Sequence, residues 1–121
     1  MEVIQKISVA FIAFLHLGFL YMEMFLWSRP QGLKIFKIDA AFALKSATLA
    51  ANQGLYNGFL AAGLIWSLCA TVPEQRFQLK IFFLVCVLVA GIYGGMTASR
   101  NILFLQAIPA LLALTLVFLT K

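Results

Sequence analysis

Four long apolar stretches alternate with short polar connections along the chain. Residues 7–22, 46–72, 81–99 and 101–120 carry no charged side chain. A membrane-spanning helix needs about 20 mostly apolar residues. The pattern therefore predicts four spans, at about residues 3–27, 47–71, 78–98 and 102–120, within a single transmembrane domain that covers residues 1–121.

The connections between these stretches are short, which is typical of antiparallel neighbouring helices. We therefore predict an all-α fold, an integral membrane four-helix bundle. Residues 28–38 mix basic with large apolar side chains and are predicted to lie along the membrane interface. Asp39 is the expected N-cap of the next helix, which we expect to enter the membrane near Asn52. Because Glu2 precedes Lys6 and the apolar run is long, the first stretch is expected to remain a span, not a cleaved signal peptide.

Small residues and one proline refine this picture. Gly54 and Gly58 are four residues apart, as are Gly91 and Gly95. Small residues at this spacing allow membrane helices to approach closely, so the second and third spans are predicted to make central contacts. Pro109 lies inside the fourth span and is expected to kink it, because its ring removes one helix hydrogen bond.

Composition strengthens the membrane assignment. Apolar residues make up 64% of the chain and charged residues 11%, against about 45–50% and about 25% in soluble domains. A small globule cannot bury so much apolar surface, which excludes a water-soluble enzyme and a nucleic-acid-binding module. The net charge of +5 comes from basic residues between the apolar stretches, where anionic lipid headgroups are the expected partner. Cys69 and Cys86 are expected to be small buried hydrophobes, with no disulfide.

The polar minority carries the functional signal, because such groups are costly inside spans and mark functional sites by default. His16 and Glu23 are seven residues apart on the first helix and so share a face. The other polar groups gather where the second helix begins, the third ends and the fourth begins: Asn52, Gln53, Tyr56, Asn57, Tyr93, Thr97, Arg100, Asn101 and Gln106. All lie toward one membrane face. The other half of the bundle is almost bare of polar groups, with Ser67, Thr71, Thr115 and Thr120. The segregation predicts a one-sided polar pocket.

A pocket between apolar helices favours a lipophilic small molecule as its ligand. His16 and Glu23 are the candidate catalytic pair, because an imidazole and a carboxyl can act as general acid and base. The expected chemistry is of an acid–base isomerase or hydrolase type, with no metal and no cofactor, although the sequence leaves open whether the pocket catalyses a reaction. The candidates for substrate binding, whose polar groups would orient a substrate, are Asn52, Gln53, Tyr56, Asn57, Tyr93 and Arg100.

Each of these residues also has a structural interpretation. His16 fits a hydrogen-bonded packing histidine, Glu23 fits an interfacial carboxylate, and the amides fit groups that bridge membrane helices. The alternative functions are accordingly a structural or interaction membrane protein, or a small proton-coupled transporter subunit. A transporter needs polar groups in both membrane halves, which the pattern does not provide. The expected partners are membrane lipids and no nucleic acid, and a homo-oligomer stays open.

Several motifs resemble one bacterial family. They are His16 with the run at residues 23–27, the Asn-Gln-Gly-Leu-Tyr-Asn-Gly-Phe run at residues 52–59, and residues 90–94 and 106–110. Together they resemble the family designated domain of unknown function 1304, over nearly the whole chain. The resemblance implies a compact, multi-pass four-helix protein of the bacterial inner (plasma) membrane, and it implies no reaction. A looser similarity in residue types links the predicted pocket to the sterol-isomerase-like membrane proteins.

Overall fold

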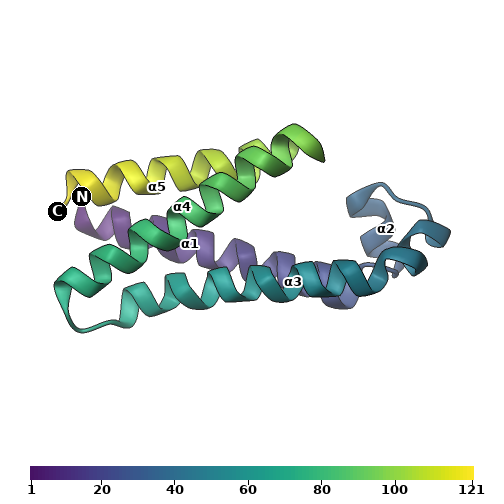
Figure 1. Ribbon diagram of the computed structural model, residues 1–121, viewed down its shortest axis with the longest axis horizontal. Helices are drawn as coiled ribbons and strands as arrows, with labels where there is room; N and C mark the ends of the chain where they lie inside the picture. The colour runs from purple at the N-terminus through teal and green to yellow at the C-terminus, as the bar shows by residue number, and fades with distance from the viewer. The chain divides into compact units, whose positions relative to one another are not determined.

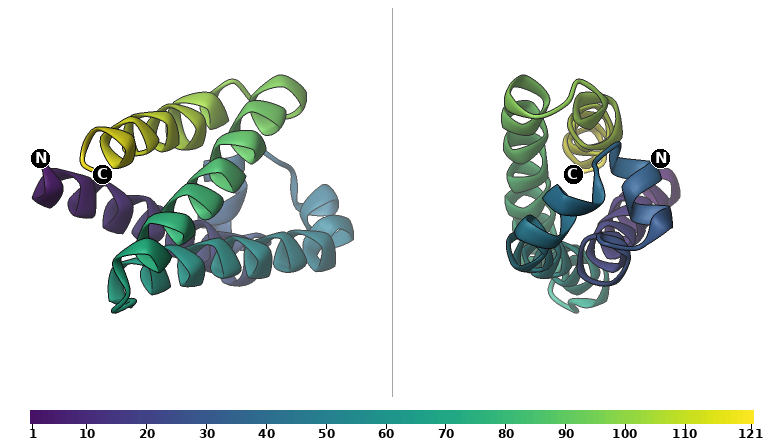
Figure 2. Two further views of the ribbon diagram at one scale, coloured as in Figure 1. Left: turned by 60° about the vertical axis from the view of Figure 1, so that its left-hand side comes forward. Right: turned by 90° about the vertical axis from the view of Figure 1, so that its right-hand side faces the viewer.

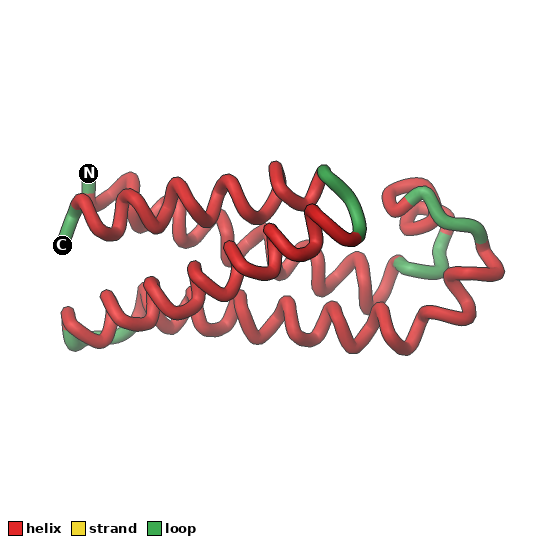
Figure 3. Tube along the Cα trace, turned by 45° about the horizontal axis from the view of Figure 1, so that its top comes forward, coloured by secondary structure: helices red, strands yellow, loops and turns green.

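A computed structural model describes residues 1–121 as an almost entirely helical chain with no strand (Figure 3). The π-helical turns are denoted η. The elements in chain order are α1 (Glu2–Tyr21), η1 (Met22–Leu26), α2 (Pro30–Phe36), α3 (Ala40–Cys69), α4 (Pro73–Thr97), η2 (Leu103–Ala107) and α5 (Ile108–Leu119) (Figure 1). The all-α fold class is confirmed.

Two helical stretches are long and apolar enough to cross a membrane. They are Glu2–Leu26, with a mean hydropathy of 1.9, and Pro73–Thr97, with a mean hydropathy of 2.1. The first and third predicted spans overlap these stretches and end one residue beyond each. The second predicted span covers the later part of α3, which is one helix of 30 residues, and runs two residues past its end. The fourth belongs to the shorter apolar helix Leu103–Leu119.

The chain divides into two compact units. The terminal unit comprises residues 1–13 and 60–121. Within it, α4 turns through η2 into α5, and α4 packs against both (Figures 1 and 2). Both chain ends lie at the same end of this unit (Figure 1). Its core is built from small and aliphatic side chains of α1, α3, α4 and α5: Val9, Ile12, Ala13, Leu64, Leu84, Val87, Ala110, Ala113, Leu114 and Val117.

The middle unit comprises residues 14–59. In this unit α2 packs against η1. Trp27 fixes the connection between η1 and α3, because its Nε1 donates a hydrogen bond to Ser46 Oγ at 3.0 Å. The Trp27 ring also contacts Phe36, with ring centroids 4.6 Å apart. Trp27 therefore links η1 both to the start of α3 and to α2.

The start of α3 confirms the predicted cap. Asp39 Oδ1 accepts a hydrogen bond from the backbone N–H of Phe42 at 2.7 Å, which is N-cap geometry. The segment before it, predicted to lie along the membrane interface, folds as the short helix α2. This helix begins at Pro30 and ends at Phe36, and its C-cap residue Lys37 has a φ of 54°, in the left-handed region.

Close packing at the α4 glycines is also confirmed. A Cβ on Gly91 would lie 2.6 Å from the backbone nitrogen of Ala107, and a Cβ on Gly95 would clash with Leu103. Both neighbours belong to η2, so these glycines contact the fourth predicted span and not the second. A larger residue at either position would push α4 away from η2.

The irregularity predicted at Pro109 takes the form of a π-helical turn just before it. The turn η2 ends at Ala107, and α5 then begins with Pro109 in its first positions. Proline has no N–H and clashes with the carbonyl four residues earlier. The wider π-helical turn reduces that clash.

The two cysteines differ in their surroundings. Cys69, at the end of α3, is exposed, and Cys86 in α4 is half-buried. The expectation that both are buried was therefore wrong for Cys69. The sequence pattern missed this because an apolar run does not distinguish the inward from the outward face of a helix.

Candidate functional site

The middle unit brings two of the predicted site residues into direct contact. Asn57 Nδ2 donates a hydrogen bond to Glu23 Oε1 at 2.6 Å. Asn57 is buried, with 7% of its surface exposed, and Glu23 is half-buried. This bond joins η1 to α3 across 34 residues of sequence. A carboxyl group is thus fixed in orientation by an amide from the neighbouring helix.

The backbone that carries Glu23 is π-helical. Met22–Leu26 forms η1 immediately after the regular α-helix ends at Tyr21. The turn lies at the C-terminal end of α1 and is followed by the non-helical residues 27–29, and π-turns occur at such helix ends. It also changes the helical phase, so the seven-residue spacing from His16 to Glu23 does not define one face as strictly as predicted. No apolar or polar spacing in the sequence indicated this turn.

Two glycines allow α3 to approach the helix that carries Glu23. A Cβ on Gly54 would lie 3.1 Å from Glu23 Cβ and 2.9 Å from Met24 Cγ. A Cβ on Gly58, one turn later, would lie 2.5 Å from Leu20 Cδ1. The close approach predicted for Gly54 and Gly58 is confirmed. It brings Asn57 within hydrogen-bonding distance of the carboxyl.

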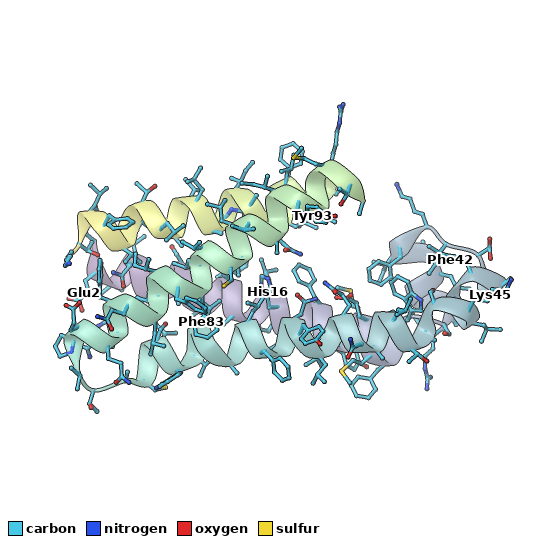
Figure 4. All side chains as sticks on the ribbon, viewed as in Figure 1. Glu2, His16, Phe42, Lys45, Phe83 and Tyr93 are labelled. Carbon is cyan, nitrogen blue, oxygen red and sulfur yellow. The ribbon has the colours of Figure 1, made fainter.

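His16 lies on the α-helical part of the same chain segment (Figure 4). Its side chain has 0% exposed surface. Its ring meets the Phe19 ring edge to face, with centroids 5.2 Å apart and an interplanar angle of 72°. The prediction that His16 is an interior residue is therefore confirmed, whereas its catalytic role stays a prediction.

Three other candidates on α3 point away from an enclosed site. Asn52, Gln53 and Tyr56 are exposed, and Tyr56 stacks edge to face on Phe59 with ring centroids 5.7 Å apart. Of the four polar residues that crowd this part of α3, only Asn57 is buried. The helical period explains the result, because adjacent positions on a helix cannot all face one side.

The last two candidates belong to the terminal unit. Tyr93 is 71% exposed near the end of α4 (Figure 4), and Arg100 is exposed in the turn before η2. Thr97 Oγ1 donates a hydrogen bond to the carbonyl oxygen of Tyr93 at 2.7 Å, a bond within the helix. Nothing within the terminal unit encloses either side chain. Their role in substrate binding stays a prediction.

The terminal unit contains a buried polar network that was not predicted from the sequence. Lys80 Nζ donates to Gln5 Oε1 at 2.6 Å, and Gln5 Nε2 donates to Thr120 Oγ1 at 2.7 Å. Lys80 and Gln5 are only 6% and 5% exposed. The half of the bundle that was expected to be almost bare of polar groups therefore contains a network. A signal existed: Lys80 is followed directly by Ile81 and aromatic residues, which is unusual for a cation in a loop.

The Glu23–Asn57 pair has limited but definite chemistry. A half-buried carboxyl can exchange a proton with a bound ligand or accept a hydrogen bond from its hydroxyl or amine. The amide of Asn57 occupies Glu23 Oε1, so Glu23 Oε2 is the carboxyl oxygen left for a ligand. The chain brings together no group of three or more His, Cys, Asp and Glu side chains, so the site offers no set of metal ligands.

Comparisons with known proteins identify relatives of the chain and no activity. The sequence model of the family described as "Protein of unknown function (DUF1304)" matches residues 10–118. The "Uncharacterized protein YpaA" of Lactococcus lactis subsp. lactis (strain IL1403) is 28% identical over 97 residues, which are 78% of this chain and 80% of that relative. No solved structure matches the chain. The family resemblance predicted from the motifs is confirmed.

Proposed function

The chain belongs to the DUF1304 family, and we propose that it is a four-span protein of the bacterial plasma membrane whose Glu23–Asn57 pair binds a lipophilic small molecule. The observation that carries the proposal is the hydrogen bond from Asn57 Nδ2 to Glu23 Oε1. It holds a carboxyl group at the π-helical turn that ends α1, in an otherwise apolar stretch.

Membrane embedding is supported by the apolar surface of the long helices. Of the most apolar windows of Glu2–Leu26 and Pro73–Thr97, only 22% and 28% are buried. The core helix of a soluble protein would be mostly buried, whereas lipid tails can cover an exposed apolar surface. Large side chains such as Phe14, Leu49 and Met96 are more than two-thirds exposed, which also favours a lipid environment.

The chemistry of the pair favours a ligand with an apolar body and one polar group. The residues beside Glu23 on η1, which are Met22, Met24 and Phe25, are all apolar. A lipophilic alcohol or amine could place its hydrogen-bond donor on Glu23 Oε2 while its apolar part stays in the membrane. Since His16 has no exposed surface, Glu23 is the group that contacts the ligand. Proton transfer at this carboxyl would be the reaction of an isomerase or hydrolase type.

The test uses full-length protein in lipid nanodiscs and two photoreactive probes, diazirine-bearing farnesol and farnesylamine. We expect labelling to concentrate in residues 14–59 and to fall by about tenfold in Glu23→Gln, the order expected from losing a charge-assisted hydrogen bond. Glu74→Gln is the matched control, because Glu74 also accepts an amide hydrogen bond, from Gln78 at 3.2 Å, but is exposed in the terminal unit.

The same variants separate binding from a purely structural role. If Glu23→Gln lowers stability but labelling of the middle unit stays unchanged, the pair locks helix packing and the binding proposal is wrong. If labelling falls equally in Glu23→Gln and Glu74→Gln, the loss is not specific to the Glu23 carboxyl and the binding proposal is also wrong. Turnover of either probe by the wild type, absent in Glu23→Gln, would extend the proposal from binding to catalysis.

A further inference from the structure

The hydrogen bonds of the terminal unit's polar network run in one direction. Lys80 donates to Gln5 Oε1, Gln5 Nε2 donates to Thr120 Oγ1, and Thr120 Oγ1 donates to the carbonyl oxygen of Leu116 at 2.7 Å. The acceptor oxygen of Gln5 is therefore used by the cation. The network fixes the position of the ammonium group and contains no carboxylate.

Lys80 is a buried cation without a carboxylate partner. Only 6% of its surface is exposed. The one salt bridge of the chain does not involve Lys80, because it joins Lys6 Nζ to Glu2 Oε1 at 2.9 Å. An ammonium group has three N–H donors, of which the protein uses one. Burying an unpaired charge is unfavourable. An anion bound at Lys80 would remove that cost and occupy the remaining donors.

Lys80 lines a hollow of about 290 Å³. Residues near both chain ends, Glu2 and Lys121, also line it, and the two chain ends lie at one end of the unit (Figures 1 and 3). Arg76 and Lys121 line the same hollow. Glu2 and Glu74 also line it, but Glu2 is paired with Lys6 and Glu74 Oε1 accepts a hydrogen bond from Gln78. Lys121 Nζ lies 4.1 Å from the centroid of the Phe77 ring, which holds a third cation at the hollow.

We propose that this hollow binds a phosphate group, held by Lys80 at its base and by Arg76 and Lys121 at its rim. Phosphate fits because its several oxygens can accept hydrogen bonds from an ammonium and a guanidinium at once. The volume accommodates a phosphate with a small substituent but not a large apolar ligand. Gln5 and Thr120 act as positioning residues, because they fix the ammonium without donating to the anion.

The source of the phosphate follows from where the hollow lies on the helices. It sits at the first turns of α1 and α4 and the last turn of α5. If these helices span a membrane, their ends lie at the depth of the phospholipid headgroups, where basic residues attract anionic lipids. The headgroup phosphate of an anionic phospholipid is therefore the proposed ligand. This source rests on the membrane embedding in the proposed function and is independent of the Glu23 site.

The experiment is native mass spectrometry of the full-length protein released from detergent micelles, with phosphatidylglycerol, diacylglycerol or inorganic phosphate added. We expect retained phosphatidylglycerol and no retained diacylglycerol, which has the same tails without the phosphate. Lys80→Met is expected to weaken phosphatidylglycerol binding by about tenfold, as for the loss of one charge-assisted contact. Lys45→Met is the matched control, because Lys45 is an exposed cation of the middle unit (Figure 4).

Arg76→Gln is a second variant that leaves the buried network intact and is expected to weaken binding by about threefold. Two results would overturn the proposal. One is that the wild type, Lys80→Met and Arg76→Gln bind phosphatidylglycerol equally well. The other is that Lys45→Met weakens binding as much as Lys80→Met does. Binding of inorganic phosphate that displaces the lipid and depends on Lys80 would keep the phosphate site and replace the lipid source by a soluble one. Glu23→Gln should leave phosphatidylglycerol binding unchanged, so failure here and failure of the Glu23 site are distinguishable.

Discussion

Each of the two units uses one buried amide to hold one ionisable side chain, but with opposite polarity. In the middle unit, Asn57 donates its N–H to the carboxyl of Glu23. In the terminal unit, Gln5 offers its oxygen to the ammonium of Lys80. Glu23 stands on a π-helical turn, whereas Lys80 stands on a regular α-helix two turns from its start. Lys80 carries its charge at the end of a four-carbon side chain, whereas the carboxyl of Glu23 stands on two methylene groups and stays closer to its helix. This difference underlies the two proposals, a headgroup phosphate at Lys80 and a lipophilic ligand at Glu23.

The units also differ in how they are held together. The terminal unit has a core of ten small and aliphatic side chains, and the middle unit adds to the close approach at Gly54 and Gly58 the polar contacts of Trp27 and Asn57. Close-packed cores are sensitive to small increases in volume. Substitutions that increase volume should therefore be most damaging in the terminal unit, and loss of a single polar contact should be less so.

The largest effect is expected from Gly91→Ala in the terminal unit. The added Cβ would lie 2.6 Å from the backbone nitrogen of Ala107, so α4 and η2 must separate, at a cost of about 3 kcal/mol in the free energy of unfolding. The measurement is far-UV circular dichroism during titration with sodium dodecyl sulfate. Gly18→Ala is the control, because nothing lies within 4 Å of its Cβ position. It should raise stability by about 0.5 kcal/mol through helix propensity. Equal effects of the two substitutions would contradict the packing at η2.

Gln5→Leu is expected to cost about 2 kcal/mol, because it leaves the buried Lys80 without its acceptor. The double variant Gln5→Leu/Lys80→Met should recover more than half of that loss, since replacing both partners by apolar groups removes the unpaired charge. The same detergent titration gives both values. A double variant less stable than Gln5→Leu would show that Lys80 stabilises the unit through contacts other than its bond to Gln5.

Asn57→Leu should cost about 1 kcal/mol, the order measured for hydrogen bonds between membrane helices. It removes the donor to Glu23 Oε1. In the double variant Glu23→Gln/Asn57→Leu, the two losses should not add, because both single changes disrupt the same bond. Strictly additive losses would indicate that the carboxyl and the amide act separately. The loss of stability expected for Asn57→Leu is smaller than that for Gln5→Leu, because Glu23 is half-buried whereas Lys80 is buried.

The sequence predicted the helical class, the cap at Asp39 and the tight glycine contacts, because these follow from local patterns of apolar, capping and small residues. It also identified Glu23 and Asn57, since polar groups inside apolar runs are conspicuous. It missed the network of Gln5, Lys80 and Thr120, because polar residues near span ends are common and their meeting depends on how three helices pack. The π-helical turns have no signal in residue spacing, so the altered phase after Tyr21 could only come from the structure.

The smallest effect tests whether the polar contact of Trp27 matters beyond its ring packing. Trp27→Phe keeps an aromatic ring beside Phe36 but removes the hydrogen bond from Nε1 to Ser46 Oγ, so we expect a loss of about 0.5 kcal/mol. The chain has two tryptophans, and Trp66 is 51% exposed on α3 in the terminal unit. Trp66→Phe is therefore the matched control, with an expected change near zero. Ser46→Ala should reproduce the loss seen in Trp27→Phe and add nothing to it when the two are combined. Independent losses would mean that the tryptophan stabilises the middle unit through its ring alone, and the contrast with the core-dominated terminal unit would then weaken.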